Sequence, residues 1–185
     1  MTRVIFKGKF IALRLNMKNV LFVCTGNVCR SPMAEELLRS HLNGHQDIKV
    51  GSAGIGAVEG QPASPFAVEV MKEKGLDISR LRSRPIQQEM VRHADCIFVM
   101  TYGHLDSLLL LYPSAAEKTF MLREFQPGLS PDEREVDDPI GQSRETYRAC
   151  RDQMADSMPS LLEVVRNGVG KSVGASGSMA IGLAG

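Results

Sequence analysis

The residues best suited to chemistry in this sequence lie close together, between positions 24 and 31. Cys24 is followed, after five intervening residues, by Arg30 and then by Ser31. A cysteine thiolate is a strong nucleophile. The planar guanidinium group of arginine can hold two oxygens of a phosphate group at once. The spacing therefore predicts a site where Cys24 attacks phosphorus while Arg30 binds the phosphate oxygens.

The flanking elements would position these groups. Residues 20–23 form a short, continuously apolar run that is typical of a strand buried on both faces, and Cys24 follows directly. Ser31 and Pro32 predict a helix start, with Ser31 as the N-cap and Pro32 as the first helical residue. The residues between must form a tight loop with inward amides beside the positive end of a helix. Such a loop is an anion cradle, and it would favour the thiolate form of Cys24.

The composition limits the classes of protein to consider. The chain has 185 residues and a formal net charge of +1, which fits one globular domain and implies no nucleic-acid partner. Its four cysteines lack the paired spacing of a zinc site and are too few for a secreted disulfide scaffold. We therefore expect a cytoplasmic protein without a metal or cofactor. No apolar run approaches membrane-spanning length, and the N-terminal segment is not a convincing signal peptide.

The two ends of the chain differ from the middle. Residues 1–16 precede a second methionine, Met17, from which the first strand could begin directly, so this extension could be dispensable. An added edge strand over 4–6, an upstream start and a flexible arm also fit it. Residues 168–185 are rich in glycine, alanine and serine without periodicity, which predicts a disordered tail. The predicted domain spans residues 17–167.

Strands and helices alternate along this domain. We expect further strands over 48–53, 96–100 and 118–122, and helices over 33–43, 64–74, 105–111 and 143–165. In the first helix Glu35, Glu36 and Arg39 should face outward, and Pro159 should kink or split the last helix. The alternation predicts a single three-layer α/β domain, with a central four-stranded parallel sheet flanked by helices and the phosphate loop after its first strand. Ligands bind at the carboxyl ends of such strands, where Cys24 lies.

The motif Cys-x5-Arg-Ser after the first strand, with Gly26, Asn27 and Cys29 inside it, resembles the signature of the protein tyrosine phosphatases in its low-molecular-weight form. The resemblance covers roughly residues 18–165. It implies hydrolysis of phosphorylated proteins through a cysteinyl-phosphate intermediate, with the cysteine and the arginine of the motif as catalytic residues. It assigns the phosphate contacts to Thr25, Gly26, Asn27, Val28, Cys29 and Arg30. A buried, inert thiol is commoner for a strand-end cysteine, but it leaves the arginine and the turn glycine unexplained.

A second chemical element is Asp137-Asp138-Pro139, in a loop over 123–142 that is too long for a simple connection. A leaving group needs a proton and the later water must lose one, so a carboxyl group near the thiolate can perform both steps. By similarity to the Asp-Pro loop of the family, Asp138 is this acid and base, and Asp137 is the alternative carboxylate. Taken alone, Asp-Pro is more often only a turn dipeptide.

The resemblance also implies supports for the loop. Asn27 tolerates left-handed backbone geometry, and its amide would brace the loop against Ser31 and Ser52. Ser52 could equally be a plain polar residue at a strand end. Many members of the family carry a histidine in the segment matching 79–83, where this chain has Leu81. One supporting hydrogen bond is therefore in question.

Two histidines and two cysteines are expected to have structural roles. His93 and His104 lack a second ligand at metal-binding spacing, so we expect surface or helix-end positions for them. Cys96 lies within an apolar strand and Cys150 on the apolar side of the last helix, so both should fill the core.

Cys29 is predicted to be a redox partner of the nucleophile. It lies five residues after Cys24 in one tight loop, so modest motion could bring the two sulfurs to bonding distance. Oxidised Cys24 would then be trapped as a disulfide and protected from further oxidation. The alternative is that Cys29 only packs behind the loop.

The substrate could be phosphotyrosine or phosphoarginine. Val28 occupies a loop position where tyrosine phosphatases of this class usually carry a branched aliphatic residue and the related arginine phosphatases carry threonine. In contrast, Ile140 and Gly141 stand where tyrosine-specific members commonly have aromatic residues. The segment 138–147 is closer to the bacterial arginine-phosphatase branch. We place phosphotyrosine first because Val28 touches the phosphate region directly.

Two other functions share parts of this pattern. A thioredoxin-coupled arsenate reductase of the same fold needs two further cysteines close together, and the segment 101–104 after the third strand has none. A non-catalytic phosphoprotein-binding module would keep the arginine but lose the nucleophile or the acid, whereas Cys24 and Asp138 are both present. The sequence therefore favours a phosphatase.

Overall fold

Four parallel strands form the centre of the fold in the computed structural model, which describes residues 17–42, 44 and 47–167. The expectations for 1–16 and 168–185 lie outside the described residues. The strands are β1 (Lys18–Cys24), β2 (Ile48–Gly54), β3 (Cys96–Val99) and β4 (Thr119–Met121), in the spatial order β2-β1-β3-β4. The helices are α1 (Arg30–His41), α2 (Pro65–Lys72), α3 (Gln88–His93), α4 (Tyr102–Leu111) and α5 (Arg144–Asn167), with short 3-10 helices η1 (Pro113–Lys118) and η2 (Pro131–Arg134). The predicted four-stranded parallel α/β fold is confirmed.

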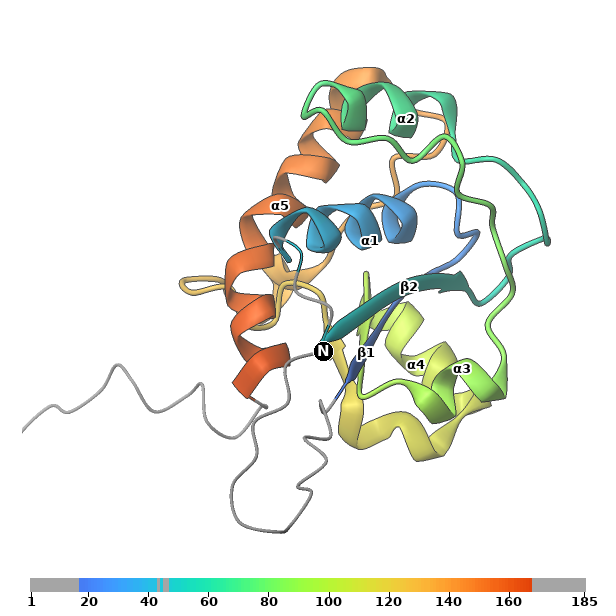
Figure 1. Cartoon of the computed structure of the whole chain (residues 1–185), viewed down its shortest axis with the longest axis vertical. Helices are drawn as coiled ribbons and strands as arrows, with labels where there is room; N and C mark the ends of the chain where they lie inside the picture. The colour runs from blue at the N-terminus through green and yellow to red at the C-terminus, as the bar shows by residue number, and fades with distance from the viewer. Residues whose placement is uncertain (1–16, 43, 45–46, 168–185) are drawn as a thin grey trace, which may run out of the picture.

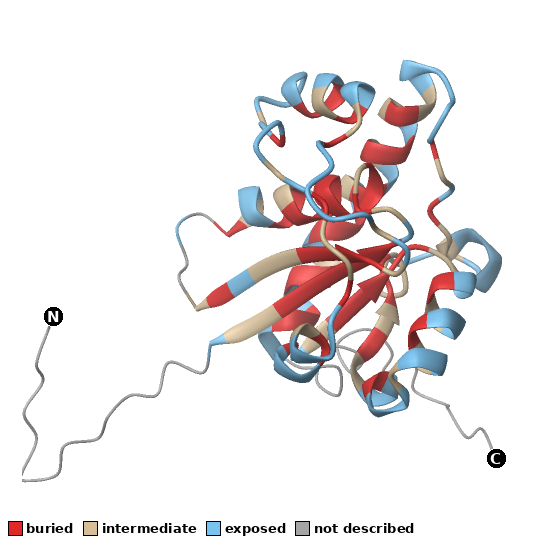
Figure 2. Ribbon diagram, turned by 90° about the vertical axis from the view of Figure 1, so that its right-hand side faces the viewer, coloured by how far each residue is buried: buried red, intermediate tan, exposed pale blue. Residues whose placement is uncertain are grey.

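β1 lies inside the sheet, because it pairs with β2 on one side and with β3 on the other. Its side chains alternate between two apolar cores: Phe22 and Cys24 face one, and Leu21 and Val23 face the other. Burial on both faces explains why residues 20–23 are continuously apolar. Figure 2 shows the same arrangement, with buried residues running through the strands and along the inner sides of the helices.

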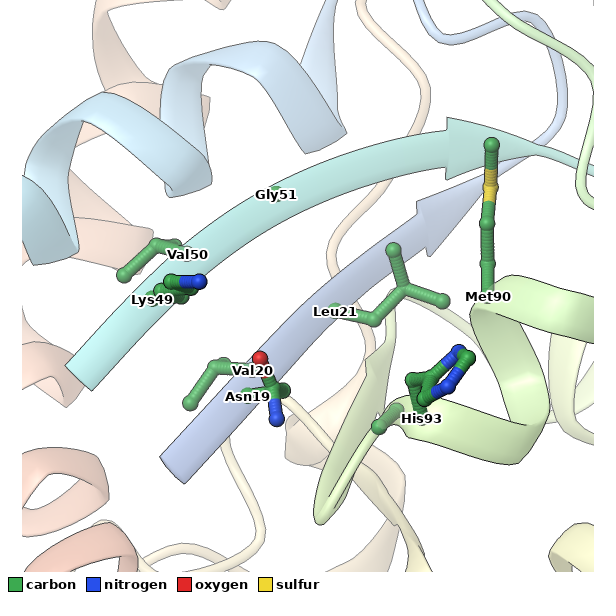
Figure 3. A pocket seen from close by; sticks show the side chains of 9 residues that line it. Asn19, Val20, Leu21, Lys49, Val50, Gly51, Met90 and His93 are labelled. Atoms are coloured by element: carbon green, nitrogen blue, oxygen red, sulfur yellow. The ribbon is translucent and has the colours of Figure 1, made fainter. Parts of the chain in front are cut away.

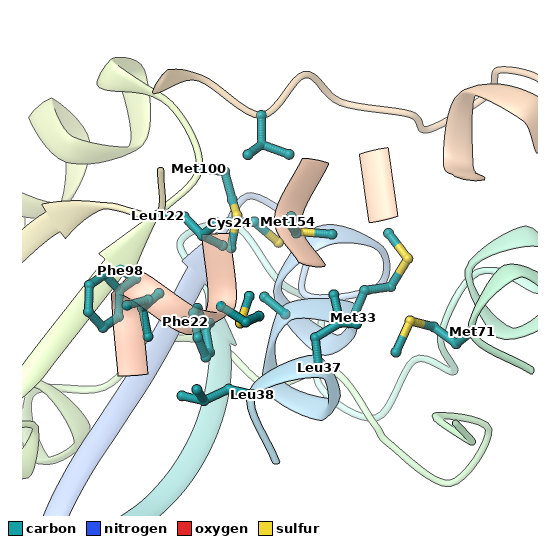
Figure 4. Close-up of a cluster of buried hydrophobic side chains, with 14 of the residues drawn as sticks. Phe22, Cys24, Met33, Leu37, Leu38, Met71, Phe98, Met100, Leu122 and Met154 are labelled. Atoms are coloured by element: carbon teal, nitrogen blue, oxygen red, sulfur yellow. The ribbon is translucent and has the colours of Figure 1, made fainter. Parts of the chain in front are cut away.

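The helices form a layer on each face of the sheet (Figure 1). α1, α2 and α5 pack against one face, and α3 and α4 against the other. The larger core lies under the first group, where Met33 and Leu37 of α1 meet Phe22 and Met154 (Figure 4). The smaller core includes Leu108 of α4. Within the described part of the chain, none of the helices has both the length and the apolar composition needed to cross a membrane.

A row of three phenylalanines joins the strands on the side of the larger core. Phe22, Phe98 and Phe120 are paired in register on β1, β3 and β4. Their ring centroids are 5.7 Å and 6.2 Å apart. Such aromatic pairs contribute roughly 0.5–1.5 kcal/mol beyond the area that they bury. The row fixes β1 against its neighbours and so fixes where Cys24 leaves the sheet.

The start of α1 differs from the prediction. The helix begins at Arg30 with Cys29 as its N-cap, rather than with Ser31 as N-cap and Pro32 as first residue. No side chain caps it. The hydroxyl group of Ser31 bonds to Cys24 instead, so tertiary contact with the thiol has replaced the local cap.

Two further helices differ from the expectations. α5 continues as one helix through Pro159, so of the two predicted outcomes, a kink or a split, the split does not occur. Pro159 is exposed, and water can bond the carbonyl group that proline leaves unpaired. No helix was expected where α3 forms, because its six residues bury only Val91 and give too short a period to detect.

Candidate active site

The phosphate loop, residues 25–29, connects the carboxyl end of β1 to α1. Cys24 ends β1 and is 2% exposed. Asn27 has a φ of 53°, a left-handed conformation that asparagine tolerates, and this lets the chain turn back. A Cβ atom on Gly54 of β2 would come within 2.5 Å of the carbonyl oxygen of Thr25, so only glycine fits there. The loop is thus closed against β2.

Hydrogen-bond donors surround the sulfur of Cys24. Its Sγ lies 3.0 Å from Ser31 Oγ and 3.3 Å from the backbone nitrogen of Asn27. Both contacts favour a negative charge on sulfur, and so does the N-terminal end of α1. The predicted nucleophile therefore lies beside a hydroxyl group and a backbone amide at the start of α1.

A chain of hydrogen bonds leads from this sulfur to a buried carboxylate. The hydroxyl group of Ser52 donates to Glu35. Asn27 Nδ2 donates to Ser52 Oγ and to Ser31 Oγ, both at 2.9 Å. Because Ser31 Oγ accepts from Asn27, its own hydrogen is left for Cys24 Sγ at 3.0 Å or for the more distant carbonyl oxygen of Ala53 at 3.5 Å. The expected contacts of Asn27 with Ser31 and Ser52 are present.

Glu35 was expected on the outer side of α1, and this is wrong. It is 4% exposed, and it also forms an ion pair with Arg39 one turn further along the helix. A buried carboxylate needs such partners. The signal in the sequence is spacing, because Glu35 follows Ser31 by four residues and shares its side of the helix.

The support that was in question comes from a backbone amide. The backbone nitrogen of Arg84 donates to Asn27 Oδ1 at 3.0 Å, and its Nε donates to the carbonyl oxygen of Ser52 at 2.7 Å. Leu81, where a histidine is common in the family, packs against the larger core. All the hydrogen-bonding groups of the Asn27 side chain are therefore satisfied without that histidine.

Arg30 is 3% exposed, and its guanidinium group meets the long loop that precedes α5. Nη1 donates to the carbonyl oxygen of Val136 at 3.2 Å, and Nη2 lies 2.5 Å from Asp138 Oδ2. Nε is buried and has no hydrogen-bond partner among the described residues. A buried donor without a partner is unfavourable, and this N–H fits an oxygen of a bound anion.

Of the two adjacent carboxylates, Asp138 is the one that faces Arg30. Its side chain is 40% exposed, and its Oδ1 accepts a hydrogen bond from the backbone nitrogen of Ile140 at 3.2 Å. Asp137 is exposed. Asp138 is therefore held by the loop beside the arginine, and its carboxylate is partly open to water.

Cys29 packs behind the loop. Its Sγ is 3.3 Å from Tyr147 Oη, which is 2.9 Å from Ser64 Oγ. Burial raises the pKa of the Cys29 thiol, and it raises the pKa of Tyr147 to about 12. Burial also raises the pKa of Cys150, which lies in the core as expected, to about 12. All four cysteines are free thiols, and the redox role of Cys29 stays a prediction.

His104 also contacts the phosphate loop, and the sequence did not predict this contact. The expectation for His104 was a surface or helix-end position, and it does lie in the first turn of α4. It is only 8% exposed, however, and its ring lies between Thr25 and Thr101. His93, in contrast, is at the surface as expected. Because β1 and β3 are parallel neighbours, the segments that follow them meet at one edge of the sheet. That adjacency is the signal that could have found His104.

Among the described residues, no group of three or more histidine, cysteine, aspartate or glutamate side chains could hold a metal ion. A pocket of about 200 Å³ lies away from the loop, beside β1, β2 and α3, with Asn19, Lys49 and His93 in its lining (Figure 3). This pocket contains no residue of the phosphate loop.

Known proteins resemble this chain in sequence and in structure. The family described as low molecular weight phosphotyrosine protein phosphatase matches residues 19–171. A protein-arginine-phosphatase from Geobacillus stearothermophilus is 42% identical over 145 residues, which are 78% of this chain and 93% of that protein. The low molecular weight protein-tyrosine-phosphatase Wzb from Escherichia coli is 37% identical over 131 residues, or 71% of this chain and 84% of Wzb. A low molecular weight protein tyrosine phosphatase from T. tengcongensis superposes with a TM-score of 0.73 at 40% identity, covering 79% of this chain and 98% of that one.

Proposed function

The chain belongs to the low molecular weight protein tyrosine phosphatase family, whose members are hydrolases, and from this premise we propose that it hydrolyses phosphotyrosine in proteins through a cysteinyl-phosphate intermediate. The observation that carries the proposal is the setting of Cys24. Its sulfur lies 3.0 Å from Ser31 Oγ, in a loop that ends at the buried Arg30.

In the first step, the sulfur of Cys24 attacks phosphorus and the bond from phosphorus to the leaving oxygen breaks. The loop amides and the unpaired Nε of Arg30 would bind the phosphoryl oxygens, where negative charge is spread in the transition state. Asp138 gives its proton to the leaving oxygen. The products of this step are the dephosphorylated side chain and the cysteinyl phosphate.

In the second step, water attacks the phosphorus of the cysteinyl phosphate and the phosphorus–sulfur bond breaks. Asp138 takes a proton from the attacking water. The hydroxyl group of Ser31 and the amide of Asn27 hold the thiolate that leaves. Inorganic phosphate is released, and both Cys24 and Asp138 return to their starting states.

We place phosphotyrosine ahead of phosphoarginine as the proposed substrate because of Val28. This half-buried residue gives the loop an apolar side chain that packs against the larger core. An apolar neighbour suits an aryl group, whereas the N–H groups of a phosphorylated guanidinium need acceptors. Phosphoarginine is the second candidate, because Ile140, two residues after Asp138 in the same loop, is 54% exposed and offers no aromatic ring. The relative from G. stearothermophilus is named as an arginine phosphatase.

The choice between the two substrates can be tested by turnover of phosphotyrosine and phosphoarginine peptides side by side. We expect the wild type to favour phosphotyrosine, and Val28→Thr to shift the ratio of kcat/KM values toward phosphoarginine. A wild type that favours phosphoarginine would reverse the order of the candidates.

The chemistry itself can be tested with Cys24→Ser. A serine hydroxyl group is not ionised near neutral pH, so hydrolysis of an aryl phosphate should be abolished while the folded protein still binds inorganic phosphate. Retention of a substantial fraction of the activity by a correctly folded Cys24→Ser would refute the covalent mechanism.

We also propose a cytoplasmic location and a phosphatase domain over 17–167. The free thiols support the first, and the match of the family to 19–171 supports the second. Phosphorylated proteins would be the partners.

A further inference from the structure

The first turn of α4 reaches the phosphate loop through one buried imidazole. His104 Nε2 lies 2.8 Å from Oγ1 of Thr25, the residue directly after the nucleophile. On the other side of the ring, Nδ1 lies 2.8 Å from Thr101 Oγ1. Thr101 is the N-cap of α4, and its hydroxyl oxygen also accepts the backbone N–H of His104 at 3.2 Å. The imidazole thus joins a rigid helix start to the loop.

The ring is neutral near pH 7. Burial and then the positive charge of Arg30 lower the pKa of His104 from 6.5 to about 4, while Asp138 acts in the opposite direction. A neutral ring carries one N–H, so one nitrogen donates and the other accepts. The hydroxyl group of Thr101 can give its hydrogen to Nδ1, which leaves the Nε2 hydrogen for Thr25. This assignment gives both ring nitrogens a partner.

Backbone hydrogen bonds hold the start of the phosphate loop, since the carbonyl oxygens of Cys24 and Thr25 accept the N–H groups of Ile55 and Gly56 at 2.9 Å. The side chain of Asn27 adds hydrogen bonds of its own. Those bonds reach Ser31 and Ser52, on the side of α1 and β2. Thr25 is exposed and lies at the other end of the loop. Its side chain is held by His104, from across β3 and α4.

We propose that His104 is a positioning residue for the phosphate loop: by holding the hydroxyl group of Thr25, it fixes the backbone next to Cys24 and aligns the nucleophile with the bound phosphate. The proposal rests on the proposed phosphatase function. Small errors in such alignment lower the catalytic rate strongly, since a displacement of about 1 Å can reduce it by roughly 10²-fold.

Two substitutions of His104 separate its two contacts. Glutamine can place its side-chain nitrogen near the position of Nε2, where it donates, whereas asparagine can place its side-chain oxygen near Nδ1, where it accepts. His104→Asn therefore keeps only the contact with Thr101, and His104→Gln keeps the contact with Thr25. We expect His104→Asn to lower kcat/KM for an aryl phosphate roughly 10- to 100-fold and to weaken inhibition by inorganic phosphate. His104→Gln should recover most of this loss.

The test includes a double substitution and a surface control. Thr25→Val should cause a loss similar to that of His104→Asn, and the double variant should be no worse than the poorer single one, because both remove the same contact. His93→Ala, on the exposed side of α3, should leave the kinetics unchanged, and thermal unfolding should show that all variants are folded.

The outcomes are distinct. Losses that add in the double variant, equal losses in His104→Gln and His104→Asn, or no loss in His104→Asn would each overturn the positioning role. A wild type that hydrolyses no aryl phosphate would instead refute the proposed function, because the comparison among variants presupposes that activity.

Discussion

The carboxylate of Asp138 lies 2.5 Å from the guanidinium group of Arg30, so the expected proton donor is an ion-pair partner of the expected phosphate-binding residue. A phosphate group bound to the unpaired Nε of the same guanidinium would lie close to this carboxylate. The expected acid is therefore within reach of the phosphate that Arg30 is expected to bind.

Asp138→Asn should lower kcat by roughly 10² to 10⁴ for a substrate with a poor leaving group, the usual range for general acid–base catalysis. A nitrophenyl phosphate, whose leaving group needs less protonation, should lose less. Steady-state kinetics on both substrates measures this. Asp137→Asn is the matched control, because Asp137 is exposed and should change little; a larger effect of that substitution would mean that Asp137 is the acid.

Glu35→Leu should impair both catalysis and stability, because it leaves the hydroxyl group of Ser52 without its buried acceptor. We expect the free energy of unfolding to fall by roughly 1–3 kcal/mol and kcat to fall about tenfold as the bonds to Ser31 loosen. Urea unfolding and kinetics measure the two effects. Glu36→Leu is the control, because the side chain of Glu36 is less buried than that of Glu35 and lies 3.6 Å from Arg39. Equal effects of the two substitutions would argue against a role for the buried carboxylate.

Peroxide should inactivate the protein reversibly if Cys29 traps oxidised Cys24. Peroxide converts the Cys24 thiolate to a sulfenic acid, and the Cys29 thiolate then displaces water to form a disulfide, which a thiol reductant opens. Recovery of activity after reduction should be lost in Cys29→Ser and kept in Cys150→Ser. Equal recovery in Cys29→Ser would leave Cys29 as packing alone.

The contact between Cys29 and Tyr147 adds a kinetic expectation. Cys29 must leave the hydroxyl group of Tyr147 and lose a proton that its raised pKa retains. Tyr147→Phe should therefore speed disulfide formation, which peptide mass mapping at timed intervals can follow. A slower reaction in Tyr147→Phe would mean that the tyrosine assists the exchange.

Mild acid should destabilise the protein partly through His104, whose pKa is lowered from 6.5 to about 4. Between these values the unfolded chain binds a proton that the folded protein does not, so the free energy of unfolding falls as the pH drops. The fall between pH 7 and pH 5, measured by urea unfolding, should be smaller in His104→Gln. Glu73, whose pKa Arg148 and Arg151 lower from 4.5 to about 2, acts mainly at lower pH. Equal falls in the two proteins would contradict a neutral buried ring.

The phosphate loop could be predicted because its information is local. An apolar strand, a cysteine, a short loop and an arginine lie next to one another in the sequence, and burial of β1 on both faces explains the apolar run. The role of Asp138 could be predicted only through the resemblance to a family, because 108 positions separate this residue from Arg30. Loop length alone indicates that such a segment has a function, without showing what it touches.

The positions of Glu35 and His104 could not be predicted from the sequence, because tertiary contacts decide them. Helical periodicity counts a glutamate as an outward residue, and only the approach of Ser52 on β2 buries Glu35. His104 meets Thr25 across 79 positions of the chain. The hydroxyl group of Ser31 had two uses, as a helix cap or as a partner of the thiol, and local propensity cannot choose between them.

The contact of Cys29 with Tyr147 also has a consequence for biosynthesis. The two residues are 118 positions apart. Translation releases the nucleophile early, whereas α5, which carries Tyr147, emerges last among the described elements. The growing chain therefore exposes Cys24 before Tyr147 can contact Cys29. We expect enzymatic activity to begin only after α5 has left the ribosome and packed against the rest of the domain.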